Sequence, residues 1–100
     1  MVIRIDTTAQ KTVEVILKDQ GVVIASLVEE NEFGSQVILP LIERLLKENN
    51  LDFKDLVGIE VATGPGSFTG LRVGVSVANA LGFSLGIPIN GKEIETELEY

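Results

Sequence analysis

The sequence has no cysteine, no histidine and no tryptophan among its 100 residues. A chain without cysteine can build neither a disulfide scaffold nor a thiolate nucleophile, and it suits a reducing compartment such as the cytoplasm. A chain without histidine lacks the commonest metal ligand and the commonest general base. We therefore expect neither a zinc site nor a Ser-His-Asp triad in this chain.

Positive charge is also scarce. Eight lysines and arginines stand against 15 acidic residues, which gives a formal net charge of −7. The field of such a chain repels phosphate backbones, so we expect no direct contact with nucleic acid, and any role in nucleic-acid chemistry should pass through a partner. The uncharged stretch 73–91 is long enough to cross a membrane, but its glycines, proline and asparagines predict a buried helix followed by a strand. We expect a cytoplasmic protein with no membrane contact.

Among the residues that are present, the stretch 63–72 stands out. A mostly apolar run at 56–62 predicts a buried strand, and the stretch after it is rich in glycine and predicts a sharp turn. A strand, a glycine-rich turn and a helix N-terminus together form a common anion site. The spacing matches neither the dinucleotide fingerprint nor a Walker A loop, which needs a lysine. A tight structural turn and a phosphate site both remain open, and the phosphate-loop candidates are Asp6, Thr7, Gly64, Gly66 and Ser67.

The hydrophobic pattern predicts five strands and two helices in one α/β domain. Three β-branched runs form an antiparallel meander with a hairpin turn at 18–21, and the later strands follow the helices. We place the domain at 1–91 and predict that 92–100, in which every second residue from Glu93 to Glu99 is a glutamate, is a solvated acidic tail or a fraying helix. The predicted strands are 2–5, 12–17, 22–28, 56–62 and 87–89.

The first predicted helix follows Ser35, a suitable N-cap, and ends at Asn49 and Asn50. Its apolar arc is wider than packing on one sheet requires, so the extra width could serve a second core contact or a partner surface. The residues of this arc that we assign to an interface are Val37, Leu41 and Leu45.

The second predicted helix covers 69–85, although its valines alternate as in a strand. Small residues recur every four positions, and such a row aligns only on a helix. Small side chains let another backbone approach closely, either within the fold or across an oligomer seam. We assign this row to the interface as well: Gly70, Gly74, Ala78 and Gly82.

The eleven residues 64–74, Gly-Pro-Gly-Ser-Phe-Thr-Gly-Leu-Arg-Val-Gly, closely resemble the signature of the TsaB (YeaZ) family. Shorter matches at 5–8, 38–46 and 85–89 stand in the family's order, so the resemblance covers roughly the first ninety residues. It implies the N-terminal half of the fold shared by sugar kinases, Hsp70 and actin (the ASKHA fold), an RNase H-like mixed sheet with flanking helices.

The resemblance implies a non-catalytic role in the threonylcarbamoyl modification of adenosine in tRNA. Family members bind and stabilise the transferase subunit TsaD, work with the ATPase TsaE, and use the two helices of this half for a four-helix contact. It further implies a homodimer when the chain is alone. Together with the missing residue types, it predicts no catalytic residue, no metal site and no bound cofactor in this chain. A competing hypothesis is a nucleotide-binding half-domain of an ATPase or kinase of the same fold.

Two departures from the family bear on these hypotheses. Gly34 stands where the family usually has histidine, so the chain cannot hold the metal of the transferase relatives there. The first phosphate loop of active relatives contains a glycine that Asp6-Thr7-Thr8 lacks, which disfavours close approach of a phosphate. The second half of the family's chain is not in this sequence.

Overall fold

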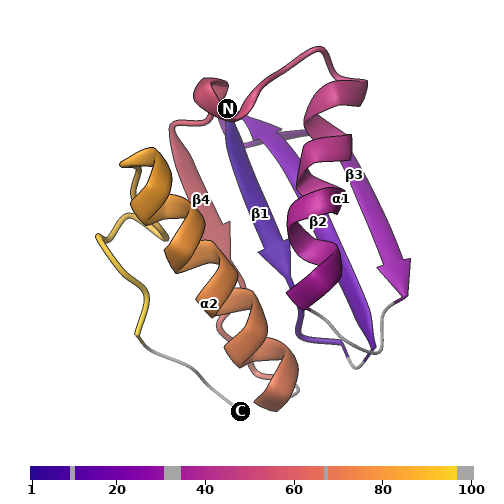
Figure 1. The fold of residues 1–100 in the computed structure, drawn as a ribbon, viewed down its shortest axis with the longest axis vertical. Coiled ribbons are helices and arrows are strands. Elements are labelled where there is room, and N and C mark those ends of the chain that lie inside the picture. The colour runs from indigo at the N-terminus through magenta and orange to yellow at the C-terminus, as the bar shows by residue number, and fades with distance from the viewer. Residues whose placement is uncertain (10, 31–34, 67, 97–100) are drawn as a thin grey trace.

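The computed structural model describes residues 1–9, 11–30, 35–66 and 68–96, without the side chains of Ser35 and Phe68. In this part of the chain a four-stranded sheet in the order β3-β2-β1-β4 carries two α-helices on one face (Figure 1). The predicted α/β class with a mixed sheet is confirmed. The strands are β1 (Val2–Asp6), β2 (Thr12–Asp19), β3 (Val22–Glu30) and β4 (Gly58–Val61), and the helices are α1 (Ser35–Glu48), η1 (Phe53–Asp55) and α2 (Phe68–Leu85).

The first three strands form the predicted antiparallel meander. β1 pairs with β2, and β2 pairs with β3 across a turn at Gln20 and Gly21. Both turn residues have positive φ, 51° and 80°, as a two-residue hairpin of matching twist requires. β4 then pairs in parallel with β1, because α1 carries the chain back across the sheet.

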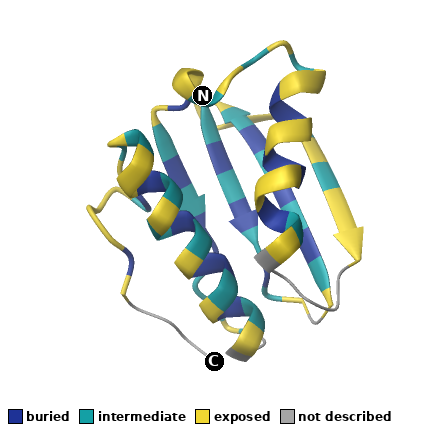
Figure 2. Ribbon diagram, viewed as in Figure 1, coloured by how far each residue is buried: buried dark blue, intermediate teal, exposed yellow. Residues whose placement is uncertain are grey.

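The core lies between the helices and one face of the sheet (Figure 2). Residues along β1, β2 and β4 alternate between buried and half-buried, which is the pattern of a sheet covered on one side. The opposite face carries polar contacts across the strands, and Glu60 accepts from Lys18 at 2.9 Å and lies 3.7 Å from Arg4. The largest fully buried side chains are Ile3, Ile5, Leu17, Ile38, Ile42, Leu45, Leu46, Ile59, Leu71 and Ile89.

The stretch with alternating valines is a helix, as the spacing of its small residues predicts. α2 runs without interruption from Phe68 to Leu85, and Val73 and Val77 pack from it against the core. Gly86 follows with φ 68°, the left-handed conformation that commonly ends helices.

The predicted fifth strand is absent from the described residues. Ile89 makes only an isolated bridge to Ile59 of β4, with Ile59 N donating to Pro88 O and Asn90 N donating to Ile59 O. The pairing stops there because the chain turns at Asn90 and Gly91, which both have positive φ. Beyond Ile59, the side chain of Asn90 pairs with the main chain of Val61.

The prediction of a solvated tail is wrong at Glu95, although the residues from Lys92 to Ile94 are exposed. Glu95 is only 4% exposed, and its main chain exchanges two hydrogen bonds with the carboxamide of Asn79 on α2. Its carboxylate accepts from Asn90 Nδ2 at 2.8 Å and from Lys92 Nζ at 3.2 Å. The chain therefore stays attached to the domain through residue 95, and residues 97–100 lie outside the described part.

Candidate protein-interaction site

The structure corrects much of the predicted interface. Leu41 and Leu45 are 3% and 1% exposed, because this side of α1 packs on the sheet. Ala78 is fully buried, and Gly74 and Gly82 are buried beside it on α2. These five residues belong to the core of the chain itself. Only Val37 and Gly70 of the predicted set are half-buried and remain candidates for contact.

The row of small residues on α2 allows close packing inside the fold. A Cβ at Gly74 would lie 2.3 Å from Thr7 Oγ1, and a Cβ at Gly82 would lie 2.3 Å from Ile89 Cδ1. Thr7 belongs to the loop after β1, and Ile89 lies beside β4. The glycines therefore let α2 sit directly on the sheet, which was the intramolecular alternative for this row.

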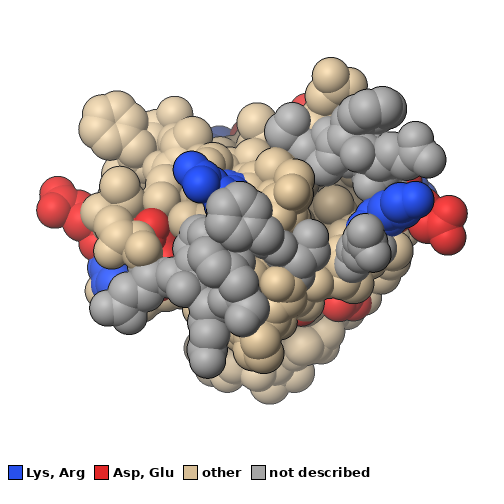
Figure 3. All heavy atoms as spheres, turned by 90° about the horizontal axis from the view of Figure 1, so that it is seen from below, with Lys and Arg blue, Asp and Glu red and all other residues tan. Residues whose placement is uncertain are grey.

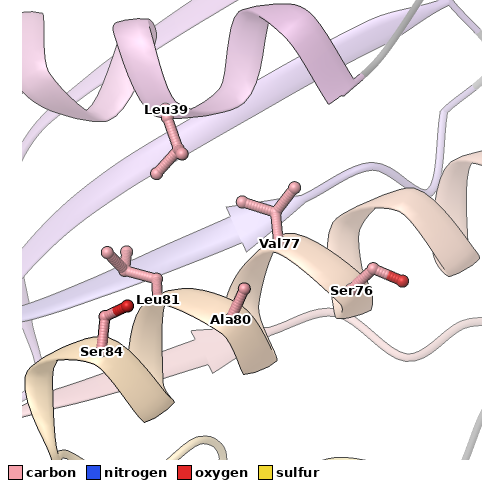
Figure 4. A pocket seen from close by; sticks show the side chains of 6 residues that line it. All are labelled: Leu39, Ser76, Val77, Ala80, Leu81 and Ser84. Atoms are coloured by element: carbon pink, nitrogen blue, oxygen red, sulfur yellow. The ribbon is translucent and has the colours of Figure 1, made fainter.

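A different set of residues lines a shallow groove between the two helices (Figure 4). Leu39 of α1 faces Val77 and Leu81 of α2 across it, and the groove holds about 280 Å³. Leu39 is 44% exposed at this groove. The other residues that line the groove are Ser76, Ala80 and Ser84.

Charge is distributed differently on the two helices beside this groove. The outer side of α1 carries two i,i+4 ion pairs, Arg44 with Glu48 and Lys47 with Glu43, each at 2.8 Å. The hydrogen bond that each cation donates to its glutamate partner raises the pKa of that cation above its ordinary value. By contrast, Arg72 is the only charged residue in the whole of α2. The wall of the groove that α2 forms therefore has no charge to desolvate when a partner covers it.

Sequence reasoning missed most of this groove. The signal was present as a second row of small, uncharged residues at 76, 80 and 84, which lies two positions from the row chosen as the interface. Both rows repeat every four residues, so spacing alone could not decide which one faces the sheet. Leu39 belongs to the broad apolar arc of the first helix, but the sequence prediction assigns other residues of that arc to the interface.

The structure places Asp6, Thr7 and Gly66 near one another, but each of them contacts Thr8 or Gly70. Thr7 Oγ1 donates to Gly70 O at 2.6 Å, and Asp6 Oδ1 accepts from Thr8 N at 3.0 Å and from Thr8 Oγ1 at 2.6 Å. A Cβ at Gly66 would lie 2.8 Å from Thr8 O. These contacts are those of a tight turn packed on the loop after β1.

The other described residues of this loop do not form an arrangement that would bind a phosphate. Gly64 has φ 120°, a conformation open to glycine, and Ser67 lies outside the described residues, as does Gly34. The described lysines and arginines on this end of the molecule lie apart from one another rather than converging (Figure 3). In the described part of the chain no group of three acidic side chains is placed to hold a metal ion.

No helix among the described residues is long and apolar enough to span a bilayer.

Comparison with known proteins agrees with the fold. Residues 9–91 match the family model of tRNA N6-adenosine threonylcarbamoyltransferase, TsaD. The chain is 34% identical over 89 residues to the tRNA threonylcarbamoyladenosine biosynthesis protein TsaB of Bacillus subtilis, which covers 89% of this chain and 39% of that protein. It is 35% identical over 92 residues to TsaB of Buchnera aphidicola from Schizaphis graminum, covering 91% and 43%.

The structural comparison gives the same result. YeaZ from Pseudomonas aeruginosa superposes with a TM-score of 0.77 at 30% identity, over 88% of this chain and 42% of that one. The chain thus spans about two fifths of the length of these relatives.

Proposed function

We propose that this chain, which belongs to the threonylcarbamoyltransferase family and within it to the TsaB (YeaZ) proteins, is a non-catalytic partner of a TsaD-type transferase. In this proposal the transferase carries out the threonylcarbamoyl modification of tRNA adenosine, and a TsaE-like ATPase completes the complex. The chain contributes a binding surface and no reacting group. It makes no direct contact with tRNA, because its net charge of −7 repels the phosphates.

The observation that carries the proposal is the groove between α1 and α2. The apolar contact area comes from Leu39, Val77 and Leu81. The small residues of α2 leave space for another helix to approach closely. A helix of the partner laid into this groove would cover Leu39, which the fold itself leaves 44% exposed. The partner that fits is therefore an apolar helix face.

Two matched substitutions test the proposal. Ala80→Glu places a carboxylate in the groove, and Ala9→Glu makes the same change at an exposed position outside it. Burying an unpaired charge costs about 3 kcal/mol or more, so Ala80→Glu should weaken binding by about a hundredfold. The affinity for a TsaD-type transferase is measured by calorimetry, with thermal unfolding of both variants to establish that they fold.

The proposal fails if the wild-type chain does not bind the transferase, or if both variants bind as the wild type does. It also fails in its non-catalytic part if the purified chain hydrolyses ATP and Asp6→Ala abolishes that turnover. Asp6 is the test position because its carboxylate lies at the end of β1, where the competing nucleotide-binding hypothesis places the phosphate loop.

A further inference from the structure

A hollow lies at the C-terminal end of α2, where residues 86–93 return to the edge of β4. It holds about 350 Å³ and shares no lining residue with the helix groove. Its apolar lining comes from Phe83, Ile87 and Pro88. A Cβ at Gly86 or Gly91 would meet no atom within 4 Å, so the hollow is open beside these two residues. The segment that forms it runs on the side of α2 away from α1 (Figure 1).

The ring of Phe83 is the main apolar group at this hollow. Phe83 is 89% exposed, the largest fraction among the exposed large hydrophobic residues of the described chain. Nearly the whole ring is therefore open to a ligand. The face of an aromatic ring carries partial negative charge and attracts a cation placed over it, most often the guanidinium of an arginine.

Two charged side chains line the hollow, and they differ in what they contact. Lys92 Nζ lies 3.2 Å from Glu95 Oε1, so its charge is already offset by a carboxylate of the same chain. Glu93 is exposed, and its carboxylate makes no hydrogen bond or ion pair with any described residue. The charge left uncompensated at the hollow is therefore negative, within a chain whose net charge is −7. The ligand that complements this charge is a cation.

We propose that the hollow binds an arginine side chain of a partner protein, with its guanidinium stacked on Phe83 and donating to the carboxylate of Glu93. A planar guanidinium can stack on a ring and also donate two parallel hydrogen bonds to a carboxylate. The apolar surface of Ile87 and Pro88 suits the methylene stem of the same side chain. A free polyamine carries the positive charge but has no planar group to stack on the ring.

The inference goes beyond the proposed function and does not rest on it. The hollow and the helix groove have no lining residue in common, so each can be altered while the other keeps its side chains. An experiment on the hollow needs no transferase, and its failure would leave the helix groove as a candidate site.

The test is a titration of the chain with a short blocked peptide that has one arginine between glycines, followed by two-dimensional NMR. We expect saturable chemical-shift changes at residues 82–93. Phe83→Ala should raise the dissociation constant about fivefold, which corresponds to an exposed cation–π contact. Glu93→Gln should raise it about threefold, as for an exposed ion pair.

Each substitution has a matched control outside the hollow. Val57→Ala truncates another exposed apolar side chain, which is 66% exposed. Glu30→Gln removes another exposed carboxylate and changes the net charge as Glu93→Gln does. We expect both controls to bind the peptide as the wild type does. Thermal unfolding of all four variants establishes that they fold.

Four results would overturn the proposal. The first is a wild-type chain without saturable shifts at residues 82–93. The second is a Glu30→Gln variant weakened as much as Glu93→Gln, because net charge alone would then attract the peptide. The third is equal binding of a peptide with citrulline, which keeps the shape of arginine without its charge. The fourth is tighter binding of putrescine, a small diamine, which would assign the hollow to a free polyamine.

Discussion

Two rows of small residues on α2 look alike in the sequence and differ completely in their surroundings. Gly74, Ala78 and Gly82 are buried against the loop after β1 and against Ile89. Ser76, Ala80 and Ser84 line the open groove toward Leu39. The two rows are offset by two residues, which is about 200° around a helix axis, so they lie on opposite sides. Small size on the inner row allows the helix to touch the sheet, and on the outer row it leaves room for a partner.

The largest expected effect comes from filling the inner row. Gly74→Leu should lower the free energy of unfolding by about 3 kcal/mol, the upper end of the usual cost of overpacking. Even a first carbon at this position would meet Thr7 Oγ1, which is already committed to a hydrogen bond with Gly70 O. Urea unfolding followed by circular dichroism measures the change. An unchanged midpoint would mean that α2 does not sit on the loop after β1 as described.

A smaller effect should separate two glycines within the inner row. A Cβ at Gly82 would meet Cδ1 and Cγ1 of Ile89, which a rotamer change can move, and would lie 3.1 Å from Ile87 O. A Cβ at Gly74 would instead meet Oγ1, Cγ2 and Cβ of Thr7, a short side chain whose hydroxyl is held by Gly70 O. We expect a loss of about 1 kcal/mol for Gly82→Ala and a larger loss for Gly74→Ala, measured in the same unfolding experiment. The reverse order would contradict the view that the flexibility of the neighbour decides the cost.

The smallest effect on folding should come from the outer row. Ala80→Leu adds a side chain to an exposed position, so the free energy of unfolding should stay within about 0.5 kcal/mol of the wild type. Affinity for a TsaD-type transferase should nevertheless fall, because the added side chain fills the groove. If Ala80→Leu lowers the free energy of unfolding as much as Gly74→Leu does, the two rows do not differ and the groove is part of the core.

The sequence predicted the local elements well and the choice between equivalent surfaces poorly. Alternating apolar residues, the turn at Gln20 and Gly21 and the four-residue spacing in α2 each depend on neighbours in the chain. The isolated bridge at Ile89 depends instead on a distant partner, since the side chain of Asn90 takes the main-chain hydrogen bonds of Val61. Local propensity favours a strand at 87–89. It does not show that the Asn90 side chain takes the place of main-chain pairing with Val61.

The same limit explains the site. The sequence predicts an interface at Leu41 and Leu45 because the apolar arc of α1 is wider than one sheet requires, but the sheet and α2 together cover these residues. Leu39 alone is left over at the boundary between the two helices. Which residue of a wide arc remains exposed depends on the position of the second helix, and that position follows from contacts far apart in the sequence.

The carboxamide of Asn90 makes this part of the domain sensitive to deamidation. It donates from Nδ2 to both Val61 O and Glu95 Oε2, and it is followed by Gly91. Asparagine before glycine is the sequence most prone to lose its amide nitrogen as a protein ages. That loss would replace the donor with a carboxylate. The new carboxylate would repel both Val61 O and the carboxylate of Glu95, which now accept from Asn90 Nδ2. Storage of the purified chain should therefore release the segment after Ile89 in step with deamidation, which mass spectrometry and protease sensitivity can follow together.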